Sequence, residues 1–312
     1  MNIIFFGTSE FAIPALHALI KHNLSPIVVV TSPDKPKNRG KQLTASPIKT
    51  WLQIDPHLAK LILQPTTIDA QFVSHIANLK PEVGIVVSYG KILPKAMIEL
   101  FPKGVLNIHP SLLPKYRGPS PIQTVILNND EKTGISIMLI DGKMDHGPTL
   151  ARQEFLILKS KFSNKITYNE LHDELSELGA QTLVEILPKW IDGKITPMPQ
   201  DDGQATYTKL LKKEDGKIDW TKPAEEIERM IRAYNPWPGT YTILKDEKIL
   251  KIKKGEVIIH QLSSIGAFFK TPDGFPAIVC GTKALKFLVV QLEGKKEMSG
   301  KAYLLGHPNL LE

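Results

Sequence analysis

Continuous apolar runs alternate with segments of helical periodicity through the first 150 residues, and this alternation limits the fold more than any other feature. The apolar runs occupy residues 2–7, 26–31, 61–63, 83–88 and 104–109. The helical patterns occupy 11–22, 69–78 and 94–101. Strands that are apolar along their whole length need cover on both faces, as in a parallel sheet with helices on each side. The pattern predicts an α/β fold with a mostly parallel, doubly wound, Rossmann-like sheet.

The pattern changes beyond residue 240, where short β segments are separated by turns. These segments occupy residues 239–244, 249–253, 256–262, 277–279 and 284–291. Several short strands with turn signals favour a second, smaller β-barrel domain of the OB-like kind. The polar, proline-containing residues 193–206 are typical of a linker. We therefore expect one domain over 1–192 and another over 207–312.

The start and one face of a long helix are also readable. Thr167 and Glu170 stand in the positions of a capping box, which predicts a helix that begins after Thr167 and ends near Trp190. Its leucines recur at helical spacing and predict a packed face, formed by Leu171, Leu175, Leu178, Leu183 and Leu187.

Composition narrows the class of protein. No apolar run approaches the roughly 18 residues that a membrane span requires, and the first residues read as a strand rather than a signal peptide. A single cysteine, Cys280, excludes an internal disulfide and a zinc finger. We therefore expect a cytoplasmic protein without a membrane partner. No coiled-coil pattern is present, so a monomer is the default.

The net charge of +7 is unevenly distributed. Residues 1–203 hold 21 basic and 19 acidic residues, whereas residues 204–312 hold 18 basic and 13 acidic residues, a net charge of +5. A basic small domain suggests a polyanionic partner such as nucleic acid. A merely solvated surface of lysines explains the same numbers, and charge alone leaves both interpretations open.

The densest polar region begins at the end of a predicted strand and runs from Asn107 to Gly118. Asn107 and His109 point to the same side of that strand, because side chains alternate with period two. An amide donor beside an imidazole can bind a developing oxyanion, and the imidazole can move a proton. Asp145, in a turn between two strands, could pair with His109 and stabilise its charged form.

Each of these residues also has a plain structural explanation. His109 could be a strand-end histidine bonded to backbone, Asn107 and Asp145 could be turn residues, and Arg117 could lie in a surface loop. A metal site built from Asn107, His109 and Asp145 would have few good ligands. The sequence lacks G-x-G-x-x-G, the P-loop and G-x-S-x-G, so nucleotide binding and serine hydrolysis lose their main signatures.

The segment Asn107–Gly118 and the later Asp145-His146-Gly147 resemble the folate-dependent formyltransferases, whose pattern is N-x-H-x-S-L-L-P-x-x-x-G followed by D-x-G. The resemblance implies formyl transfer from 10-formyltetrahydrofolate as co-substrate, without a metal. It implies catalytic roles for Asn107, His109 and Asp145, with Asn107 and His109 stabilising a tetrahedral intermediate and Asp145 orienting the histidine. It also implies a folate site, expected at Ser111, Leu112, Leu113, Pro114, Val87, Tyr89 and Gly90.

Three further segments resemble the branch of this family whose acceptor is methionyl initiator tRNA. They are the basic loop 31–41, the start of the second domain at 207–220, and the run 232–239. Asn38 departs from the family pattern, in which a glycine is common. Such a loop can reach phosphates, and we expect tRNA contacts from Lys35, Lys37, Arg39 and Lys41.

Two prolines and a glycine are expected to keep this basic loop out of helix or strand. A solvated connection remains the plain alternative for the loop. Two other functions also remain as rivals: a formyltransferase acting on a purine precursor or a sugar amine, and a nucleic-acid-binding protein with an inactive catalytic fold.

Overall fold

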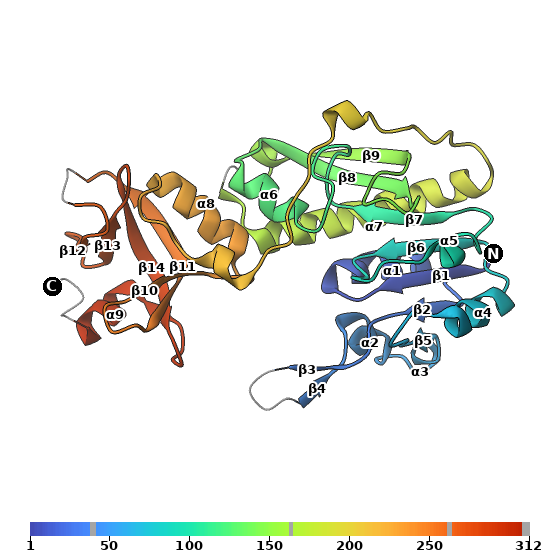
Figure 1. Ribbon diagram of the computed structural model, residues 1–312, viewed down its shortest axis with the longest axis horizontal. Helices are drawn as coiled ribbons and strands as arrows, with labels where there is room; N and C mark the ends of the chain where they lie inside the picture. Colours follow the sequence, from blue (N-terminus) through green and yellow to red (C-terminus); the bar gives the residue numbers. More distant parts are fainter. Residues whose placement is uncertain (38–41, 162–164, 261–263, 308–312) are drawn as a thin grey trace. The chain divides into compact units, whose positions relative to one another are not determined.

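The computed structural model describes residues 1–37, 42–161, 165–260 and 264–307 (Figure 1). The chain divides into two compact units. The N-terminal unit comprises residues 1–121, 132–156 and 172–208, and the C-terminal unit comprises residues 122–131, 157–171 and 209–312.

A seven-stranded sheet forms the centre of the N-terminal unit, in the order β5-β2-β1-β6-β7-β8-β9. Its strands are β1 (Ile3–Gly7), β2 (Val28–Val30), β5 (Ile62–Leu63), β6 (Val83–Val87), β7 (Val105–His109), β8 (Lys132–Leu139) and β9 (Thr149–Leu156). The pairings from β5 to β7 are parallel, whereas β7–β8 and β8–β9 are antiparallel. The predicted mostly parallel sheet is thus confirmed.

Helices of the N-terminal unit pack on the buried strands. They are α1 (Ile13–Lys21, preceded by the 3-10 turn Glu10–Ala12), α2 (Pro47–Leu52), α3 (Pro56–Ala59), α4 (Ala70–Asn78), α5 (Lys95–Ile98) and α7 (Tyr168–Ile191). Ile4 and Phe6 of β1 share one core cluster with Ile76 of α4 and Met97 of α5. Gly179 of α7 lies against Ile108 of β7, on the opposite face of that strand from Asn107 and His109.

The predicted capping box of α7 is confirmed. The Thr167 backbone N–H and hydroxyl both donate to Glu170 Oε2, at 2.8 and 2.7 Å, and the Glu170 N–H donates to Thr167 Oγ1 at 3.4 Å. Four of the five expected leucines are fully buried, and Leu178 is partly buried. The helix ends one residue beyond the expected Trp190.

The expectation that the basic loop contains no strand is wrong. Strand β3 (Lys35–Lys37) pairs antiparallel with β4 (Gln42–Thr44). Pro36 lies opposite Leu43 in a ribbon of only two strands, where a missing N–H is tolerated at an open edge. Proline and lysine composition therefore does not exclude a short edge hairpin.

Residues 198–208, most of which the sequence suggests as a linker, are hydrogen-bonded to the N-terminal unit. Thr149 and Met198 form a bridge with two backbone hydrogen bonds, at 2.8 and 2.9 Å. Farther on, the Arg117 N–H donates to Thr206 O at 2.8 Å, and the Thr208 N–H donates to Arg117 O at 2.8 Å. We call this ordered segment, which includes the 3-10 turn Asp202–Gln204, the strap.

The C-terminal unit contains an antiparallel sheet in the order β10-β11-β14-β13-β12, with β15 paired to β14. The strands are β10 (Thr240–Ile243), β11 (Ile249–Ile258), β12 (Phe268–Lys270), β13 (Pro276–Val279), β14 (Ala284–Leu292) and β15 (Met298–Ser299). The helices of this unit include α6 (Pro121–Leu127), α8 (Ala224–Tyr234) and α9 (Gly300–Gly306). Among the described residues no pairing joins β10 to β12, so the closed OB-like barrel stays a prediction.

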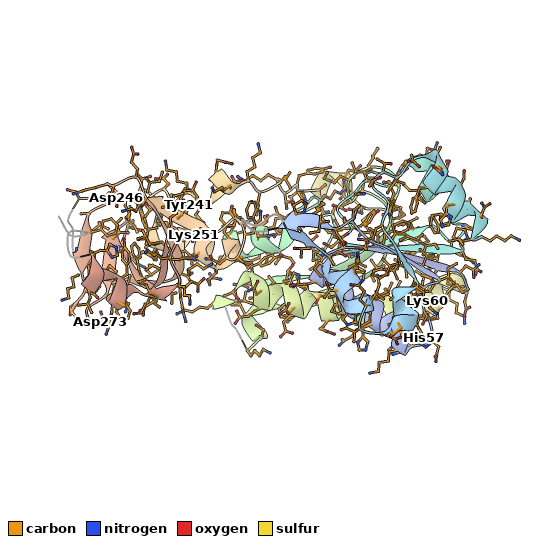
Figure 2. The ribbon with its side chains drawn as sticks, turned by 90° about the horizontal axis from the view of Figure 1, so that it is seen from below. His57, Lys60, Tyr241, Asp246, Lys251 and Asp273 are labelled. Atoms are coloured by element: carbon orange, nitrogen blue, oxygen red, sulfur yellow. The ribbon has the colours of Figure 1, made fainter. Side chains whose placement is uncertain are left out.

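Strand β11 replaces two strands that the sequence separates. The expected break after Lys253 is a register irregularity between Ile252 and Gly255, within one continuous ten-residue strand. Tyr241 of β10 lies opposite Lys251 of β11, and both are labelled in Figure 2. In the part of the chain that the structure describes, no helix is both long and apolar enough to cross a membrane.

Aromatic side chains form the centre of the hydrophobic core of the C-terminal unit. The Phe287 ring centroid lies 5.9 Å from that of Trp220 and 6.0 Å from that of Phe268. Cys280 belongs to the same core cluster, and burial raises the pKa of its thiol to about 11. This cysteine is therefore a packing residue rather than a reactive thiol.

We expect Phe287→Ala to destabilise the C-terminal unit by about 3–5 kcal/mol, because it leaves a cavity between Trp220 and Phe268. Native-state hydrogen exchange of peptides from β11 and β14 should accelerate by roughly a hundredfold or more. Phe287→Leu, which keeps most of the volume, should have a smaller effect. Equal acceleration in peptides from β1 and β6 would show that the two units are not stabilised separately.

Candidate active site

Strand β7 places two polar side chains at its carboxyl end. Asn107 lies opposite Met138 of β8, and His109 lies opposite Ser136. Both side chains point to the same side of the strand, as the alternation predicts. His109 is buried, with 4% of its surface exposed, whereas Asn107 is half-buried.

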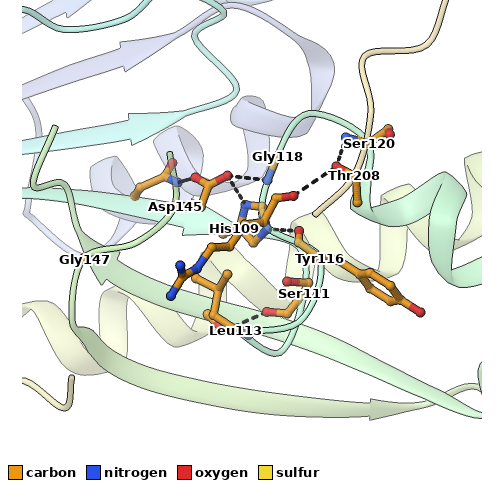
Figure 3. A network of polar contacts seen from close by, with 12 residues as sticks. His109, Ser111, Leu113, Tyr116, Gly118, Ser120, Asp145, Gly147 and Thr208 are labelled. Atoms are coloured by element: carbon orange, nitrogen blue, oxygen red, sulfur yellow. Dashed lines mark hydrogen bonds and ion pairs between the residues drawn. The ribbon is translucent and has the colours of Figure 1, made fainter. Parts of the chain in front are cut away.

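The structure brings Asp145 to these two side chains from the turn between β8 and β9 (Figure 3). Asp145 Oδ2 lies 3.7 Å from His109 Nδ1, and Oδ1 lies 3.5 Å from Asn107 Nδ2. A shorter bond of 2.8 Å comes from the Gly118 N–H to Oδ2. The expected convergence of an amide, an imidazole and a carboxylate is therefore present, with the carboxylate held mainly by the Gly118 backbone.

The other nitrogen of His109 contacts a backbone carbonyl. His109 Nε2 lies 2.9 Å from Tyr116 O, so the ring is fixed by the loop that follows its own strand. Both ring nitrogens thus face oxygen atoms, one a carbonyl and the other a carboxylate. The orientation of the ring is therefore fixed at both of its nitrogens.

Ser136 of β8 fixes the start of the loop after β7. Its Oγ donates to Ser111 O at 2.7 Å and accepts from the Leu113 N–H at 2.9 Å. Arg152 of β9 donates to Leu113 O at 3.0 Å, and Ser111 Oγ donates to Lys115 O at 2.5 Å. The loop is therefore preorganised by its own hydrogen bonds.

The seven residues predicted to bind folate differ in burial. Four have buried side chains, namely Val87, Tyr89, Ser111 and Leu113, and two are half-buried, namely Leu112 and Pro114. Gly90 is exposed, adopts φ +79°, and has open space where a Cβ would stand. Its backbone is therefore accessible to a planar ligand at the carboxyl end of β6.

Tyr89 itself is part of the core. Its ring packs edge-on against Phe6, with centroids 5.6 Å apart, and burial raises the pKa of its hydroxyl to about 12. Its carbonyl accepts a hydrogen bond of 2.9 Å from Thr8 Oγ1, which joins the loops after β1 and β6. The Tyr89 side chain is thus a packing residue of the core.

Of the four cations predicted to contact tRNA, the structure describes two on the β3–β4 hairpin. Lys35 is exposed on β3, and Lys37 ends that strand, whereas Arg39 and Lys41 lie outside the described residues. The one acid of the loop, Asp34, accepts from Lys49 Nζ at 2.8 and 2.9 Å.

The Asp34 carboxylate is paired with Lys49 and Gln64. Hydrogen bonds from Gln64 and Lys49 hold its pKa below the usual range. Lys91 is a neighbouring cation whose pKa is lowered, first by burial and then by the positive charge of Lys35. A cleft of about 300 Å³ lies at the base of the hairpin, lined in part by Thr8, Ser32 and Lys35. The region is therefore electropositive.

Two contributors to the site are missed by reasoning from side chains alone. The Tyr116 carbonyl and the Gly118 N–H both act through the backbone. Gly118 adopts φ +111°, and a Cβ there would lie 2.7 Å from Thr208 Oγ1. The glycine in Arg117-Gly118 is the one sequence signal that could have indicated this close approach.

Metal ligands are not grouped in the part of the chain that the structure describes: no three His, Cys, Asp or Glu side chains are placed to hold an ion together. The groups that converge at the site can donate hydrogen bonds, from Asn107 and His109, and can accept protons, at His109 and Asp145.

Two family models match the chain. Residues 1–187 match the model described as formyl transferase, and residues 210–308 match the model described as formyl transferase, C-terminal domain. The chain is 42% identical to the methionyl-tRNA formyltransferase of Chloroflexus aurantiacus over 308 residues, which cover 98% of this chain and 97% of that protein. It is 40% identical over 310 residues to the methionyl-tRNA formyltransferase of Caldanaerobacter subterraneus subsp. tengcongensis, with the same coverage.

Solved structures with a similar fold include HypX from Aquifex aeolicus in complex with tetrahydrofolic acid, with a TM-score of 0.66 and 15% identity. The match covers 98% of this chain and 47% of HypX, so the chain spans about half the length of that protein. An N-formyltransferase from Helicobacter canadensis, in complex with folinic acid and dTDP-3-aminofucose, has a TM-score of 0.66 at 19% identity, covering 92% of this chain and 99% of that one. At these identities the similarity shows the fold alone.

We expect neutral His109 to carry its proton on Nε2, because Nε2 faces the Tyr116 carbonyl, which can only accept. Two-bond ¹H–¹⁵N correlation spectra of the histidine rings distinguish the tautomers, with His109→Gln to assign the signal. His22 is an internal control that should show the other tautomer, with the proton on Nδ1, because its Nδ1 lies 2.8 Å from Ala18 O. A proton on Nδ1 of neutral His109 would contradict this geometry.

Proposed function

The chain belongs to the formyl transferase family, and from that premise we propose that it transfers the formyl group of 10-formyltetrahydrofolate to the α-amino group of methionyl initiator tRNA. Family membership confirms the resemblance predicted from Asn107–Gly118 and Asp145–Gly147. The relatives named methionyl-tRNA formyltransferase, at 40–42% identity over 98% of the chain, support this acceptor. The convergence of Asn107, His109 and Asp145 is the observation that carries the chemical part of the proposal.

Asn107 supplies a neutral donor to the oxyanion. Attack of the neutral amine on the formyl carbon forms a C–N bond and leaves negative charge on the formyl oxygen. The bond of 3.5 Å from Asn107 to Asp145 is long, so Nδ2 can be redirected to that oxygen at little cost. A preorganised donor at this point lowers the barrier by favouring the tetrahedral species over the planar one.

His109 and Asp145 stabilise the developing charge and transfer the proton. His109 Nδ1 is the ring nitrogen directed to the carboxylate, and once it takes up a proton it can donate to the same oxyanion. Asp145 orients the ring and accepts the proton that the attacking amine loses. When the bond from the formyl carbon to the folate nitrogen breaks, that nitrogen takes up a proton, which these two groups can relay.

The carboxyl ends of β6 and β7 are where we place the folate. The accessible Gly90 backbone and the preorganised loop Ser111–Pro114 fit a planar, hydrogen-bonding ring system with an adjoining apolar part. Leu112 and Pro114, both half-buried, offer apolar contact there. Folate supplies the activated formyl group, and the residues of this chain orient it.

Charge supports tRNA as the large substrate. Lys35, Lys37, Arg39 and Lys41 form the first cationic element, and pairing of Asp34 with Lys49 and Gln64 leaves their charge uncompensated by that carboxylate. The second element is the basic residues of 204–312, whose net charge is +5. Phosphate contacts from both elements would raise affinity in a salt-dependent way.

The remaining parts of the proposal concern organisation. We assign catalysis to residues 1–192 together with the strap, and tRNA binding to the part of residues 207–312 that follows the strap, with an OB-like closure of the second sheet. We place the protein in the cytoplasm, where charged tRNA is used, and expect it to act as a monomer.

The decisive assay is formylation of charged initiator and elongator tRNA with a 10-formyltetrahydrofolate donor. We expect transfer to methionyl initiator tRNA and much weaker transfer to the elongator. An amino sugar nucleotide and glycinamide ribonucleotide serve as competing acceptors. Preferred transfer to either small amine would contradict the proposed acceptor while keeping the family.

We expect Asn107→Ala to lower kcat by roughly 10²–10³-fold, the usual effect of removing one oxyanion donor. His109→Ala and Asp145→Ala should reduce kcat at least as strongly, because they remove proton transfer as well. Single-turnover formylation measures the chemical step, and circular dichroism checks the fold. His22→Ala, at an exposed histidine, is the control; near-normal turnover in any of the three site variants would reject the role assigned to it.

Arg39→Ala should raise the KM for methionyl-tRNA while leaving folate affinity unchanged, because the basic loop contacts phosphates rather than folate. Steady-state kinetics at several salt concentrations and a folate titration measure the two effects. Lys60→Ala, which removes an exposed cation directly after α3 (Figure 2), is the matched control. An equal loss of folate binding would contradict this division of roles.

A further inference from the structure

A fully buried guanidinium lies one residue before Gly118. Arg117 is 1% exposed, and each of its side-chain nitrogens has a partner in the strap. Nη2 donates to Asp202 Oδ1 at 2.7 Å and to Gln200 Oε1 at 2.9 Å, Nε donates to Gln200 Oε1 at 3.1 Å, and Nη1 donates to Tyr207 Oη at 3.2 Å. Burial lowers the pKa of Arg117, but hydrogen bonds to Asp202 and Tyr207 outweigh burial and raise that pKa, so the group is charged.

Arg117 fixes the orientation of the Gln200 amide. Arginine nitrogens only donate, so the atom of Gln200 that meets two of them must be the oxygen. The amide nitrogen then points the other way, where it donates to Asp145 O at 2.8 Å and to Gly147 O at 2.7 Å. One side chain of the strap therefore holds two carbonyls of the turn that carries the site carboxylate.

That turn needs external support. Asp145 adopts φ +47°, a left-handed conformation that carries a backbone cost for a residue other than glycine, and contacts around the turn offset that cost. Its carboxylate is held by the Gly118 N–H and its carbonyl by Gln200. Without Gln200, the Asp145 carbonyl would lose the hydrogen bond that the strap donates to it, and the strap would still reach the turn at His146, whose Nε2 lies 3.3 Å from Asp202 Oδ2.

We propose that Gln200 is a positioning residue for formyl transfer, set in place by Arg117, and that it aligns Asp145 with His109 and Asn107. The inference rests on the proposed function. Gln200 lies between the two segments that the family models match, 1–187 and 210–308, and in the part of the sequence expected to be a linker. The strap is thus part of the active site rather than a tether.

The test uses the full chain and two variants of Gln200. Gln200→Leu removes both functions of the amide, whereas Gln200→Glu keeps an acceptor for Arg117 and replaces the donor to Asp145 by an oxygen that cannot donate. We expect both to lower kcat about 10–100-fold, the scale of a displacement of about 1 Å, with KM for methionyl-tRNA and for folate within about twofold. Gln204→Leu, the same change at an exposed strap residue whose amide donates to Asp201 Oδ2 at 2.9 Å, is the matched control and should keep kcat.

A double-mutant comparison separates positioning from simple stabilisation of the strap. In an Asp145→Ala background, Gln200→Leu should cause no further loss of kcat, because the group that it positions is gone. A full additional loss in that background, or unchanged kcat with only a lower melting temperature, would overturn the proposal.

The ring ¹⁵N resonances of His109 give a readout that needs no substrate. Gln200→Leu should shift them, because Asp145 moves relative to Nδ1, and the control Gln204→Leu should not. If the wild-type chain fails to formylate methionyl-tRNA, the proposed function fails, and this shift still decides whether Gln200 positions the carboxylate. Unchanged His109 resonances in Gln200→Leu would overturn the inference.

Discussion

One carboxylate joins the parts of the site that are far apart in sequence. Asp145 reaches the end of β7 through His109 and Asn107, and it reaches the following loop through the Gly118 N–H at 2.8 Å. Its own backbone is in the left-handed region, so the turn does not place the carboxylate unaided. The active site therefore depends on contacts that cross the fold, and its geometry is a property of the whole N-terminal unit.

Sequence patterns predict the frame of this site well. Continuous apolar strands and helical spacing indicate a mostly parallel sheet, and strand alternation places Asn107 and His109 on one side. The Thr167 capping box fixes the start of α7 because both of its hydrogen bonds are local. Such features depend on periodicity or on residues a few positions apart, and for that reason they can be read from the chain.

Features that depend on distant partners or on the edge of a sheet are harder to predict from the sequence. Pro36 argues against a strand in the sequence, but a two-stranded ribbon tolerates a proline at its open edge, and the β3–β4 hairpin forms. The sequence pattern divides strand β11 between Lys253 and Glu256, because the polar run there contains a glycine and is typical of a turn. In the structure the ladder continues through this point with a register irregularity. The backbone donors and acceptors of the site have no side-chain signature, apart from the glycine at 118.

Arg117 shows why the strap belongs to the catalytic fold. A buried guanidinium must find acceptors, and removal of the partners of a buried charge is strongly destabilising. Its side-chain acceptors, Gln200, Asp202 and Tyr207, all come from residues 200–207, beyond the segment 1–187 that matches the first family model. A domain that ended at 187 would leave this charge without those acceptors, next to the loop that binds Asp145. The physical boundary of the catalytic fold therefore lies after the strap, because charge burial, and not the sheet alone, sets it.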